Sequence, residues 1–298
     1  MFLLKLAKTP FLFLYIKSFK QFASLAFLIC IFSYKKIMGL IASLPEIDER
    51  ERSAFVMHEK SEKLIPLHTH KKGQLGYVEG GIAYIIIDDK TYVVPARHYF
   101  WIPYGVPHIL RIGHSGTVLR SIYFYTHDDS DDIFYSKLGI YPATELLIQM
   151  INHTERWDGS HVVDSDYNFE FLVSIKKLLP LLDTRALPII LPTSKDKRLS
   201  QIMQYLEENI GEPISLKSIS ILFCMSERSL SRIFQMQLHI SFLQYVKTLR
   251  MVKAIEMLLK TNASVTDIAF SVGYDTIGSF SNTFYTFTHL RPSDLRRL

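Results

Sequence analysis

The sequence predicts a protein of two domains: a small antiparallel β-barrel or sandwich with flanking helices, followed by an all-α domain with two helix-turn-helix motifs. Three observations lead to this fold class. The chain has 298 residues, enough for two domains of about 150 residues each. Its middle part consists of short apolar runs between turn signals, which is typical of all-β domains. Its last third repeats a pattern of short and long amphipathic helices.

Composition and charge exclude several other classes. With 48% hydrophobic and 21% charged residues, the chain is typical of a folded globular protein rather than a disordered, collagen-like or multi-span membrane protein. Two cysteines, Cys30 and Cys224, are too few for a disulfide scaffold and indicate a reducing compartment. Residues 1–45 hold six lysines and no acidic residue, residues 46–194 hold 15 basic against 20 acidic residues, and residues 195–298 hold 13 against 9. This division suggests a sensing part joined to a part that faces phosphates.

The N-terminal segment is apolar and rich in lysine, and it has no helix cap. Its uncharged run, residues 21–34, has 14 residues, fewer than the roughly 20 that span a bilayer. It also lacks a clear small-x-small cleavage site. We expect translation to start at Met38, so that residues 1–37 are a mis-assigned start or a non-globular extension. A membrane anchor formed by residues 1–34 is the alternative.

The sensor domain is predicted to cover residues of about 46–130. Glycine, aspartate and proline turns separate its short apolar runs. Many short strands at regular spacing favour an antiparallel barrel or sandwich. The predicted strands are residues 74–79, 81–87, 91–94, 98–102, 108–112 and 118–125.

Two polar clusters interrupt these strands. His68 and His70 are separated by one residue and are followed four residues later by Gln74, while a Pro-Tyr-Gly-Val-Pro run leads to His108. Because alternate residues of a strand point to the same face, His68 and His70 are expected to face one cavity. A third imidazole and an amide oxygen could converge on the same cavity and bind a ligand there.

This pattern resembles the cupin family, whose first motif is His-x-His, a spacer and Glu, and whose second motif is Pro-x-Gly-x-x-His. The match covers residues of about 64–112; the second motif is intact, whereas the first has Gln74 in place of the usual Glu. The resemblance implies a jelly-roll barrel with a ligand pocket at its mouth. A three-histidine site for Zn, Mn or Fe and a metal-free pocket for an organic effector both stay open. An amide is a weaker ligand than a carboxylate, so the sequence favours an organic effector bound by His68, His70, Gln74 and His108, with no metal and no other cofactor.

Two amphipathic helices are predicted in the connecting segment, residues of about 131–183. Residues 143–157 and 168–182 place apolar side chains at helical spacing. They carry more apolar surface than a small barrel needs, which favours a dimerisation interface. Packing against the barrel is the alternative. Residues 184–195, with two prolines, are predicted to be an interdomain linker.

The last part of the chain, residues 196–298, is predicted to form helices in two similar sets. Serine or threonine stands where most of these helices should be capped, and Ser241 and Ser264 begin sequences typical of capping boxes. A short helix, a tight turn and a longer helix occur twice, which is the helix-turn-helix plan. The helices are expected at residues 199–210, 215–223, 226–237, 241–260, 264–272 and 276–287.

An internal repeat supports two helix-turn-helix units. Leu230 and Phe234 recur 50 residues later as Phe280 and Phe284, and the preceding short helices align at an offset of 49. At about 100° per residue, Leu230 and Phe234 share one face of their helix. The duplication is the observation that favours DNA binding over the solvated surface of an ordinary helical bundle.

The longer helix of the first unit places Arg228 and Arg232 opposite its apolar face. Two arginines near the start of a helix suit bidentate guanine contacts in a major groove. The corresponding helix of the second unit has almost no positive charge. The residues expected to bind DNA are Arg228, Ser229, Ser231, Arg232, Ile277, Gly278, Ser281 and Asn282.

These residues resemble the AraC/XylS family of bacterial transcriptional regulators, over residues of about 198–297. Cys224, His239 and His289 replace glycines that are usual in the family, and Asn282 stands where the family often has Arg. Histidine tolerates a left-handed backbone better than most residues, so these exchanges are survivable. The family's pattern is carried here by Ser226, Arg228, Leu230, Arg232, Phe234, Phe242, Tyr245, Arg250, Ala254, Leu258, Val265, Ile268, Ala269, Gly273, Tyr274, Phe280, Ser281, Phe284 and Pro292.

The residues and the resemblance together predict a sequence-specific transcriptional regulator, not an enzyme, whose cupin domain binds a small molecule. Helix 241–260 spans about 30 Å, close to the roughly 34 Å repeat of the duplex, so both motifs could enter successive major grooves. The expected partners are double-stranded promoter DNA, a small-molecule effector and a second copy of the chain, with RNA polymerase as a further candidate. The expected location is the cytoplasm, without a membrane partner. The alternatives are a metal-dependent cupin enzyme or metal sensor fused to a DNA-binding domain, and a membrane-tethered regulator.

Overall fold

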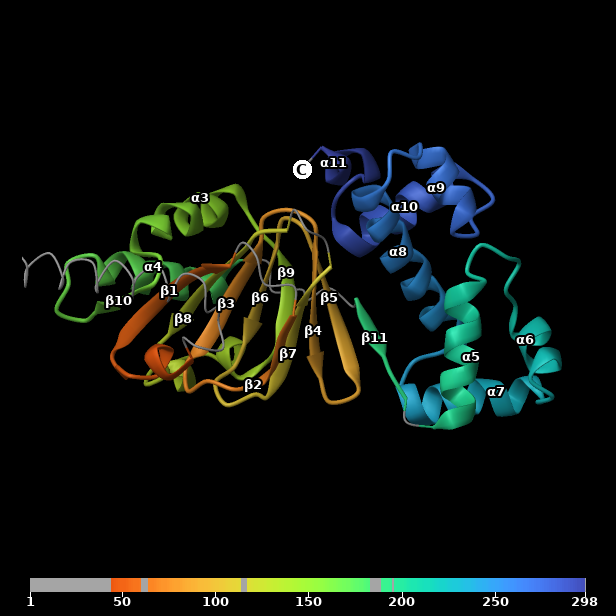
Figure 1. Ribbon diagram of the computed structural model, residues 1–298, viewed down its shortest axis with the longest axis horizontal. Coiled ribbons are helices and arrows are strands. Elements are labelled where there is room, and N and C mark those ends of the chain that lie inside the picture. Colours follow the sequence, from red (N-terminus) through yellow and green to blue (C-terminus); the bar gives the residue numbers. More distant parts are fainter. Residues whose placement is uncertain (1–43, 60–63, 114–116, 183–188, 195, 298) are drawn as a thin grey trace, which may run out of the picture. The chain divides into compact units, whose positions relative to one another are not determined.

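The structure is a computed structural model that describes residues 44–59, 64–113, 117–182, 189–194 and 196–297 (Figure 1). The expected start at Met38 and the alternative membrane anchor both fall outside these residues. The chain divides into the segment Met1–Pro45 and the unit Glu46–Leu298, which holds all the elements described below. No helix in the described part of the chain is long and apolar enough to cross a membrane.

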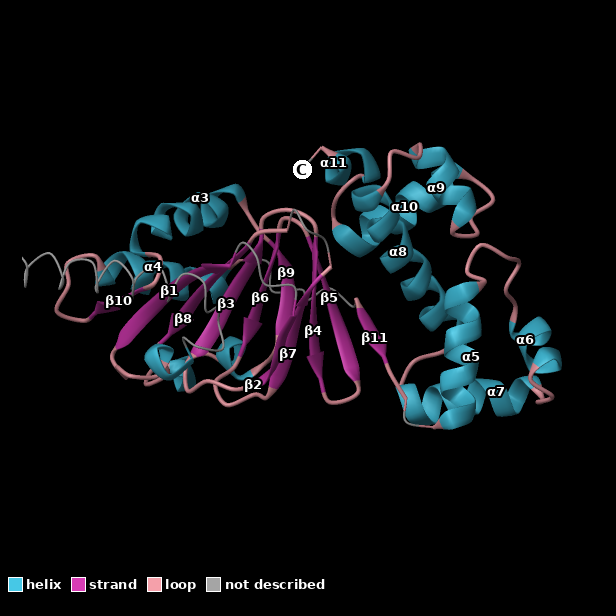
Figure 2. Ribbon diagram, in the orientation of Figure 1, coloured by secondary structure: helices cyan, strands magenta, loops and turns pink. Residues whose placement is uncertain are grey.

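Two antiparallel sheets form the first part of this unit (Figure 2). The six-stranded sheet has the order β10-β1-β8-β3-β6-β9, and the five-stranded sheet has the order β11-β5-β4-β7-β2. Strands that follow each other in the chain often lie in different sheets, which is the jelly-roll-like arrangement that the sequence predicts. The strands are β1 (Ser53–Glu59), β2 (Leu64–His68), β3 (Gly73–Val78), β4 (Ile82–Ile87), β5 (Lys90–Pro95), β6 (His98–Ile102), β7 (His108–Ile112), β8 (Leu119–Phe124), β9 (Gly139–Pro142), β10 (Ser160–Val163) and β11 (Ile190–Pro192).

The sheets extend beyond the strands that the sequence predicts. Strands β3 to β8 lie within one residue of their predicted bounds, but β1 and β2 precede them and β9 to β11 follow them. Strands β9 and β10 come from the segment for which only helices are predicted, residues 131–183, and β11 comes from the expected linker, residues 184–195. These three strands have three or four residues each, too few for a clear alternation, and they gain their partners from longer strands: β9 pairs with β6, β10 with β1 and β11 with β5.

Helices α3 (Glu145–His153) and α4 (Phe169–Leu178) cover the six-stranded sheet. Leu147 of α3 and Leu172 of α4 are fully buried in the same core as Trp101 of that sheet. Packing against the sheets therefore accounts for the buried apolar face of both predicted helices. The described residues of this part also form four short 3-10 turns: η1 (Asp129–Asp131), η2 (Ile133–Ser136), η3 (Thr154–Trp157) and η4 (Leu179–Leu181).

A buried lysine joins α4 to the segment after β8. The side chain of Lys176 has no exposed surface, and its Nζ lies 2.7 Å from Asp129 Oδ1 and also pairs with Asp128. Nζ donates to the carbonyl oxygen of Tyr125 at 2.7 Å and lies 4.2 Å from the centre of the Tyr125 ring. A buried cation needs such compensation, since removal from water costs several kcal/mol (~5) per ion.

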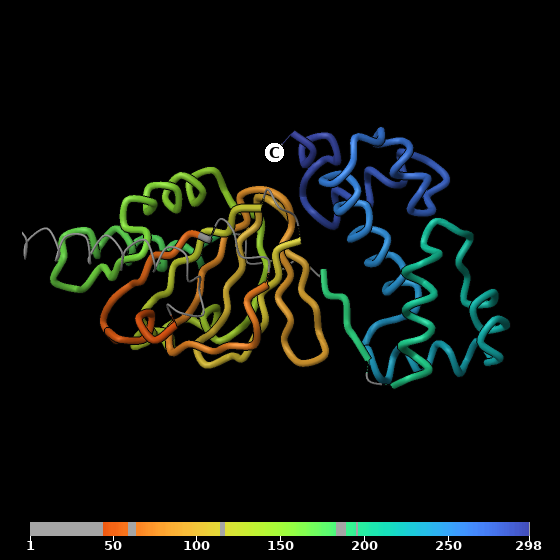
Figure 3. Tube along the Cα trace, in the orientation of Figure 1, coloured from red at the N-terminus to blue at the C-terminus, as the bar shows by residue number. Residues whose placement is uncertain are grey.

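The second part of the unit consists of helices, and its chain trace runs from one helical set through the long helix α8 to the other (Figure 3). The apolar stripes predicted from the sequence form their buried faces. The first longer helix ends in a π-helical turn, where the sequence predicts one continuous helix. The elements are α5 (Lys197–Glu208), α6 (Leu216–Leu222), α7 (Glu227–Ile233), the π-helical turn η5 (Phe234–Leu238), α8 (Phe242–Lys260), α9 (Val265–Ser271), α10 (Ile277–Thr288) and α11 (Pro292–Arg296).

Hydroxyl side chains begin five helices of this part, as predicted, whereas Asp196 caps α5 and the capping box predicted at Ser241 lacks the return bond from Gln244. Each hydroxyl accepts a hydrogen bond from the backbone N–H three residues further on, one of the N–H groups that a helix start leaves free. The capping box predicted at Ser264 is complete, since the side chain of Asp267 also accepts from the Ser264 N–H. The hydroxyl caps are Ser215, Ser226, Ser241, Ser264 and Thr276.

Candidate functional sites: a histidine cluster and two helix-turn-helix units

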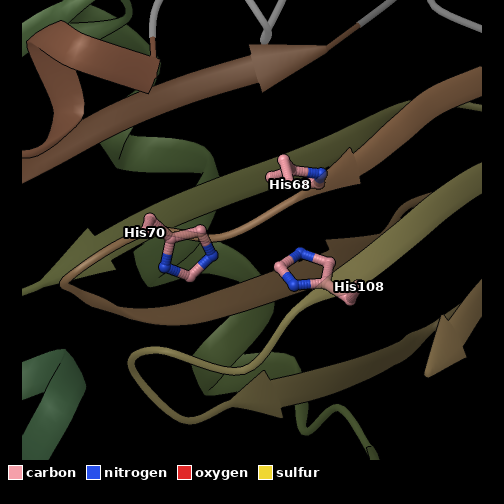
Figure 4. A group of neighbouring side chains, drawn as sticks. All are labelled: His68, His70 and His108. Carbon is pink, nitrogen blue, oxygen red and sulfur yellow. The ribbon is translucent and has the colours of Figure 1, made fainter. Parts of the chain in front are cut away.

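The three histidines singled out in the sequence lie together between β2, the loop after it and β7 (Figure 4). His68 is the last residue of β2 and pairs in register with His108, the first residue of β7. The sequence suggested that His68 and His70 face one cavity because they alternate along one strand. His70 instead lies two residues past the end of β2, and the loop between β2 and β3 places it beside the other two histidines. One ring nitrogen of each histidine lies within 4.8 Å of the other two.

Backbone carbonyls fix the orientation of each imidazole. A carbonyl oxygen can only accept, so each Nδ1 carries the ring proton and donates it, which leaves a lone pair on Nε2. The Nε2 atoms of His68 and His108 are buried and have no hydrogen-bond partner among the described residues. The donor and acceptor pairs are His68 Nδ1 to Pro66 O at 2.8 Å, His70 Nδ1 to Lys72 O at 2.5 Å and His108 Nδ1 to Val106 O at 2.9 Å.

Gln74 of β3 completes the cluster. Its amide nitrogen donates to Ser121 Oγ at 3.1 Å and to Tyr123 Oη at 3.2 Å, both on β8. The other end of the amide, Oε1, lies 3.3 Å from His70 Nε2. A hydroxyl group can donate as well as accept, so with the amide turned over Ser121 and Tyr123 would donate to its oxygen and its nitrogen would donate to the lone pair on His70 Nε2. Ser121 and Tyr123 were not identified from the sequence. These two polar residues stand at alternate positions of a buried strand, so their side chains share one face, and this pattern could have indicated them.

Burial keeps the cluster neutral. The four side chains are between 0 and 6% exposed. Burial lowers the pKa of His68 and of His70 below the usual imidazole value. Burial, followed by the nearby His68, lowers the pKa of His108 to about 3. All three imidazoles are therefore uncharged at neutral pH, the form in which histidine binds metals.

The donor set fits a divalent transition metal. Three Nε2 lone pairs and one amide oxygen make a nitrogen-rich set of a kind that suits zinc, nickel or iron. Histidines that hold metals usually donate their other N–H to a carbonyl or carboxylate, as all three rings do here. One ring nitrogen of each histidine lies within 4.8 Å of the other two, a wider spacing than the roughly 3.3 Å between the donors of tetrahedral zinc.

The helical part contains two units of the same design. Helices α6 and α7 form the first helix-turn-helix unit, and α9 and α10 form the second (Figure 1). Leu230 and Phe234 are fully buried, and so are Phe280 and Phe284 at the repeated positions. The repeat detected in the sequence is thus a repeat of core positions.

The residues predicted to bind DNA lie largely at the surface. On α7, Arg228 and Arg232 are exposed opposite the buried Leu230, as the helical spacing predicts. Ser229 also takes part in the cap of α7, since its N–H donates to Ser226 Oγ. The residues of this set are Arg228, Ser229, Ser231, Arg232, Ile277, Gly278 and Asn282, all exposed, and Ser281, partly buried.

Comparisons with known proteins match a family model to each of the two parts of the chain. A family model described as a helix-turn-helix domain matches residues 219–298, and one described as an AraC-like ligand binding domain matches residues 58–132. The second match includes the histidine cluster, and the first includes both longer helices. The chain therefore belongs to the AraC family of helix-turn-helix transcriptional regulators, in the form that carries a ligand-binding domain.

Particular relatives are named as regulators of transcription. The transcriptional activator RhaS of Citrobacter koseri is 29% identical over 153 residues, 51% of this chain and 52% of that protein. The chain thus spans about half the length of this relative. The transcriptional regulator NimR of Escherichia coli is 24% identical over 242 residues, 80% of this chain and 85% of that protein. Among solved structures, the C-terminal domain of AraT, a response regulator from Geobacillus stearothermophilus, is 32% identical over 35% of this chain and 88% of that chain, with a TM-score of 0.34.

Proposed function

We propose that this protein binds promoter DNA through α7 and α10 and that a small effector at the histidine cluster controls this binding. One observation carries the proposal: in each unit the helix that follows the turn buries its two repeated apolar side chains fully and exposes the residues at its start. In helix-turn-helix proteins this second helix enters the major groove with its N-terminal residues against the bases. The regulatory relatives favour this function over that of an enzyme.

The two units are proposed to read DNA unequally. Arg228 and Arg232 would make guanine contacts in one groove, with Ser229 and Ser231 beside them. On α10, Ile277, Gly278, Ser281 and Asn282 would face the next groove, with Asn282 able to pair with adenine. Helix α8 connects the units with 19 residues, about 28 Å in length. This length suits two successive grooves on one face of the duplex.

A hydrogen bond within the unit Glu46–Leu298 supports control by the sensor sheets. The hydroxyl of Tyr84, on β4, donates to the carboxylate of Glu256, on α8. Arg111, three residues after His108 on β7, stacks on the Tyr84 ring at 4.3 Å. A change in the position of β7 at the histidine cluster would therefore act on a side chain that binds the helix between the two DNA-reading units.

Three finer features belong to the same proposal. The protein would act in the cytoplasm as a homodimer, for which exposed apolar residues such as Leu146 and Leu181 offer contact surface. RNA polymerase is a candidate partner at the promoter. The proposed domains are a sensor domain of residues 46–130, a helical segment of residues 131–183, a linker and a DNA-binding domain of residues 196–298.

The decisive experiment is the retention of promoter fragments by the purified protein. We expect the wild-type chain to retain a small set of fragments, and a chain with Arg228→Ala and Arg232→Ala to lose that selection. Lys177→Ala is the matched control, since it removes an exposed positive charge of α4, far along the chain from α7. Equal selection by the wild-type protein and the double variant would contradict the proposal.

A further inference from the structure

We infer that a direct contact between the two helix-turn-helix units fixes the separation of their DNA-reading helices. This inter-unit contact joins residues 210–212 to residues 271–274, and Gly211, Gly273 and Arg250 are its positioning residues. The inference rests on the proposed function and goes beyond it, because it makes these three residues determinants of the groove spacing that the protein selects. None of them belongs to the set expected to read bases.

The two units do not share a core of side chains. The core of the first unit extends from Leu199 of α5 to Leu249 of α8, and among the described residues it includes no side chain of α9 or α10. Helix α8 joins the units, but a helix of this length can curve. The helix before it ends in the π-helical turn η5. A second contact besides α8 would therefore keep α7 and α10 at one separation.

Two glycines let the backbones of the units approach each other. Figure 1 shows the connection between α5 and α6 beside the end of α9, and a Cβ on Gly211 of this connection would lie 2.5 Å from the backbone oxygen of Ser271. A Cβ on Gly273, in the turn of the second unit, would lie 2.9 Å from the backbone oxygen of Ile210. Real Cβ atoms essentially never come so close to a neighbour. A side chain at Gly211 would therefore push the units apart.

The guanidinium of Arg250, on α8, lies within the inter-unit contact. Its Nη2 donates to the carbonyl oxygen of Glu212, in the first unit, at 3.4 Å. Its Cζ lies 5.8 Å from the centre of the Tyr274 ring, in the second unit, a distance at which a cation is attracted to the face of a ring. A Cβ on Gly273 would lie only 2.5 Å from Nη2. Arg250 thus holds one group from each unit.

The duplication supplies a comparison for Arg250. Arg198 lies on α5, the helix before the first unit, as Arg250 lies on α8, the helix before the second. The Nη2 of Arg198 donates to the carbonyl oxygens of Phe223 at 2.8 Å and of Cys224 at 3.3 Å. Both acceptors belong to the turn of the first unit. Arg198 therefore supports a turn within one unit, whereas Arg250 connects two units.

A cleft beside the inter-unit contact leaves room for movement. It has a volume of about 630 Å³ and is lined by Pro213 and Ser215 from the first unit and by Phe270 and Asp275 from the second. Side chains do not fill this space. The units could therefore shift relative to each other here without cutting into a packed core, so a change in the glycines or in Arg250 should alter their separation before it unfolds either unit.

The spacing of the DNA grooves is the first part of the test. A fragment that the wild-type chain retains is footprinted, and two base pairs are inserted between the two protected grooves. The insertion moves the grooves apart by about 7 Å and turns them by about 70°. The affinity of the full-length chain for both fragments is measured at one salt concentration. We expect the insertion to weaken binding at least about tenfold, because units held at one separation lose base contacts in one groove.

Variants of the inter-unit contact should lose this discrimination. Gly211→Ala adds a Cβ against the backbone of Ser271, and the backbone of Gly211 is not left-handed, so alanine meets no other strain. Arg250→Gln removes the guanidinium. We expect both to bind the original fragment about tenfold more weakly and the inserted fragment as well as the wild type does, so that the ratio of the two affinities falls close to one. Arg198→Gln is the matched control, which should change both affinities equally and keep the ratio.

A distance measured in the free protein separates this inference from the proposed function. Spin labels are attached at Gln235→Cys and Thr286→Cys, exposed positions of η5 and α10, in a chain whose native cysteines are both replaced by serine. We expect one narrow distribution of label distances in this parent chain and in the arginine control. The two variants of the inter-unit contact should give a longer or broader distribution.

The outcomes distinguish the two claims. An unchanged affinity ratio and unchanged label distances in Gly211→Ala and Arg250→Gln would overturn the inference while the proposed function stands. A wild-type chain that binds the original and the inserted fragment equally well would overturn it too. A wild-type chain that selects no fragment would contradict the proposed function, and the label distances alone would then decide the inference.

Discussion

His239 and His289 occupy the same place in the two helix-turn-helix units, where each ends the longer helix with a left-handed backbone, at φ of 58° and 54°. In the preceding turns, Cys224 has φ of 52° and the corresponding Gly273 has φ of 83°. The duplicated backbone thus needs four left-handed residues, of which one is glycine. The histidines satisfy this need in the way the sequence suggests, because histidine is enriched in that region.

Cys224 is expected to be the most strained of these residues. A left-handed backbone costs an ordinary L-residue about 1–2 kcal/mol, so Cys224→Gly should raise the free energy of unfolding by about 1 kcal/mol. His239→Gly and His289→Gly should raise it by less. Urea unfolding measures the change, with Ser231→Gly inside α7 as a control that lowers stability by roughly 0.5 kcal/mol. A Cys224→Gly chain less stable than the wild type would contradict this account of the turn.

The two DNA-reading helices should respond differently to truncation. Arg232→Ala is expected to cost about 1–3 kcal/mol of binding free energy at the specific site, because it would remove the proposed guanine contact. Asn282→Ala should cost less if α10 acts mainly through shape and packing. Titrations of one promoter fragment at fixed salt measure both, with Lys177→Ala as the charge control. An unchanged affinity in Arg232→Ala would exclude that residue from base reading, and a larger loss in Asn282→Ala would point to an asparagine–adenine pair.

Acid should weaken the fold through His98 of β6. Burial lowers the pKa of His98 to about 4, and the nearby His289 acts in the same direction, against the hydrogen bond to the Ala96 carbonyl. The unfolded chain, with an imidazole pKa near 6.5, binds the proton first. The neutral ring therefore makes its full contribution to the free energy of unfolding above pH 6.5. This contribution, about 3 kcal/mol, is lost as the pH falls toward 4.

His98→Gln tests this pH dependence. A neutral amide does not titrate in this range, so the variant should show a shallower fall of the unfolding free energy between pH 6.5 and 4 than the wild-type chain. Denaturant unfolding at several pH values measures the slope. Identical slopes in the two proteins would mean that His98 is not a source of the acid sensitivity.

Removal of the buried Lys176 charge should be costly. Lys176→Met leaves Asp128 and Asp129 without their cation, and breaking a buried pair in this way costs about 3–5 kcal/mol. Adding Asp128→Asn and Asp129→Asn should recover part of the loss, because no unpaired charge then remains. Urea unfolding measures each variant, and Lys177→Met on the exposed side of α4 should stay within about 0.5 kcal/mol of the wild type. A stable Lys176→Met chain would show that the ion pair contributes little.

Regular patterns explain why much of the fold is predictable from the sequence. Strands β3 to β8 are short, largely apolar runs between turn signals, and the hydroxyl caps mark several helix starts, so both appear close to their predicted bounds. Strands β9 to β11 are too short to alternate and depend on partners distant in the chain. The histidine motifs predict that His68, His70 and His108 converge, but His70 lies in the loop after β2 rather than on the strand. The direction of Gln74 depends on Ser121 and Tyr123, 47 and 49 residues away, and no local pattern encodes it.

The carbonyls that hold the three imidazoles belong to residues only two positions from each histidine. The choice of tautomer is thus a property of three short pieces of backbone, independent of how closely the sheets pack around them. The rings lost their rotational freedom when the chain folded, a loss of roughly 0.5–1.5 kcal/mol per side chain that a binding event would otherwise bear. A ligand that binds here meets side chains that are already ordered, so less of its binding free energy is lost in fixing the rings.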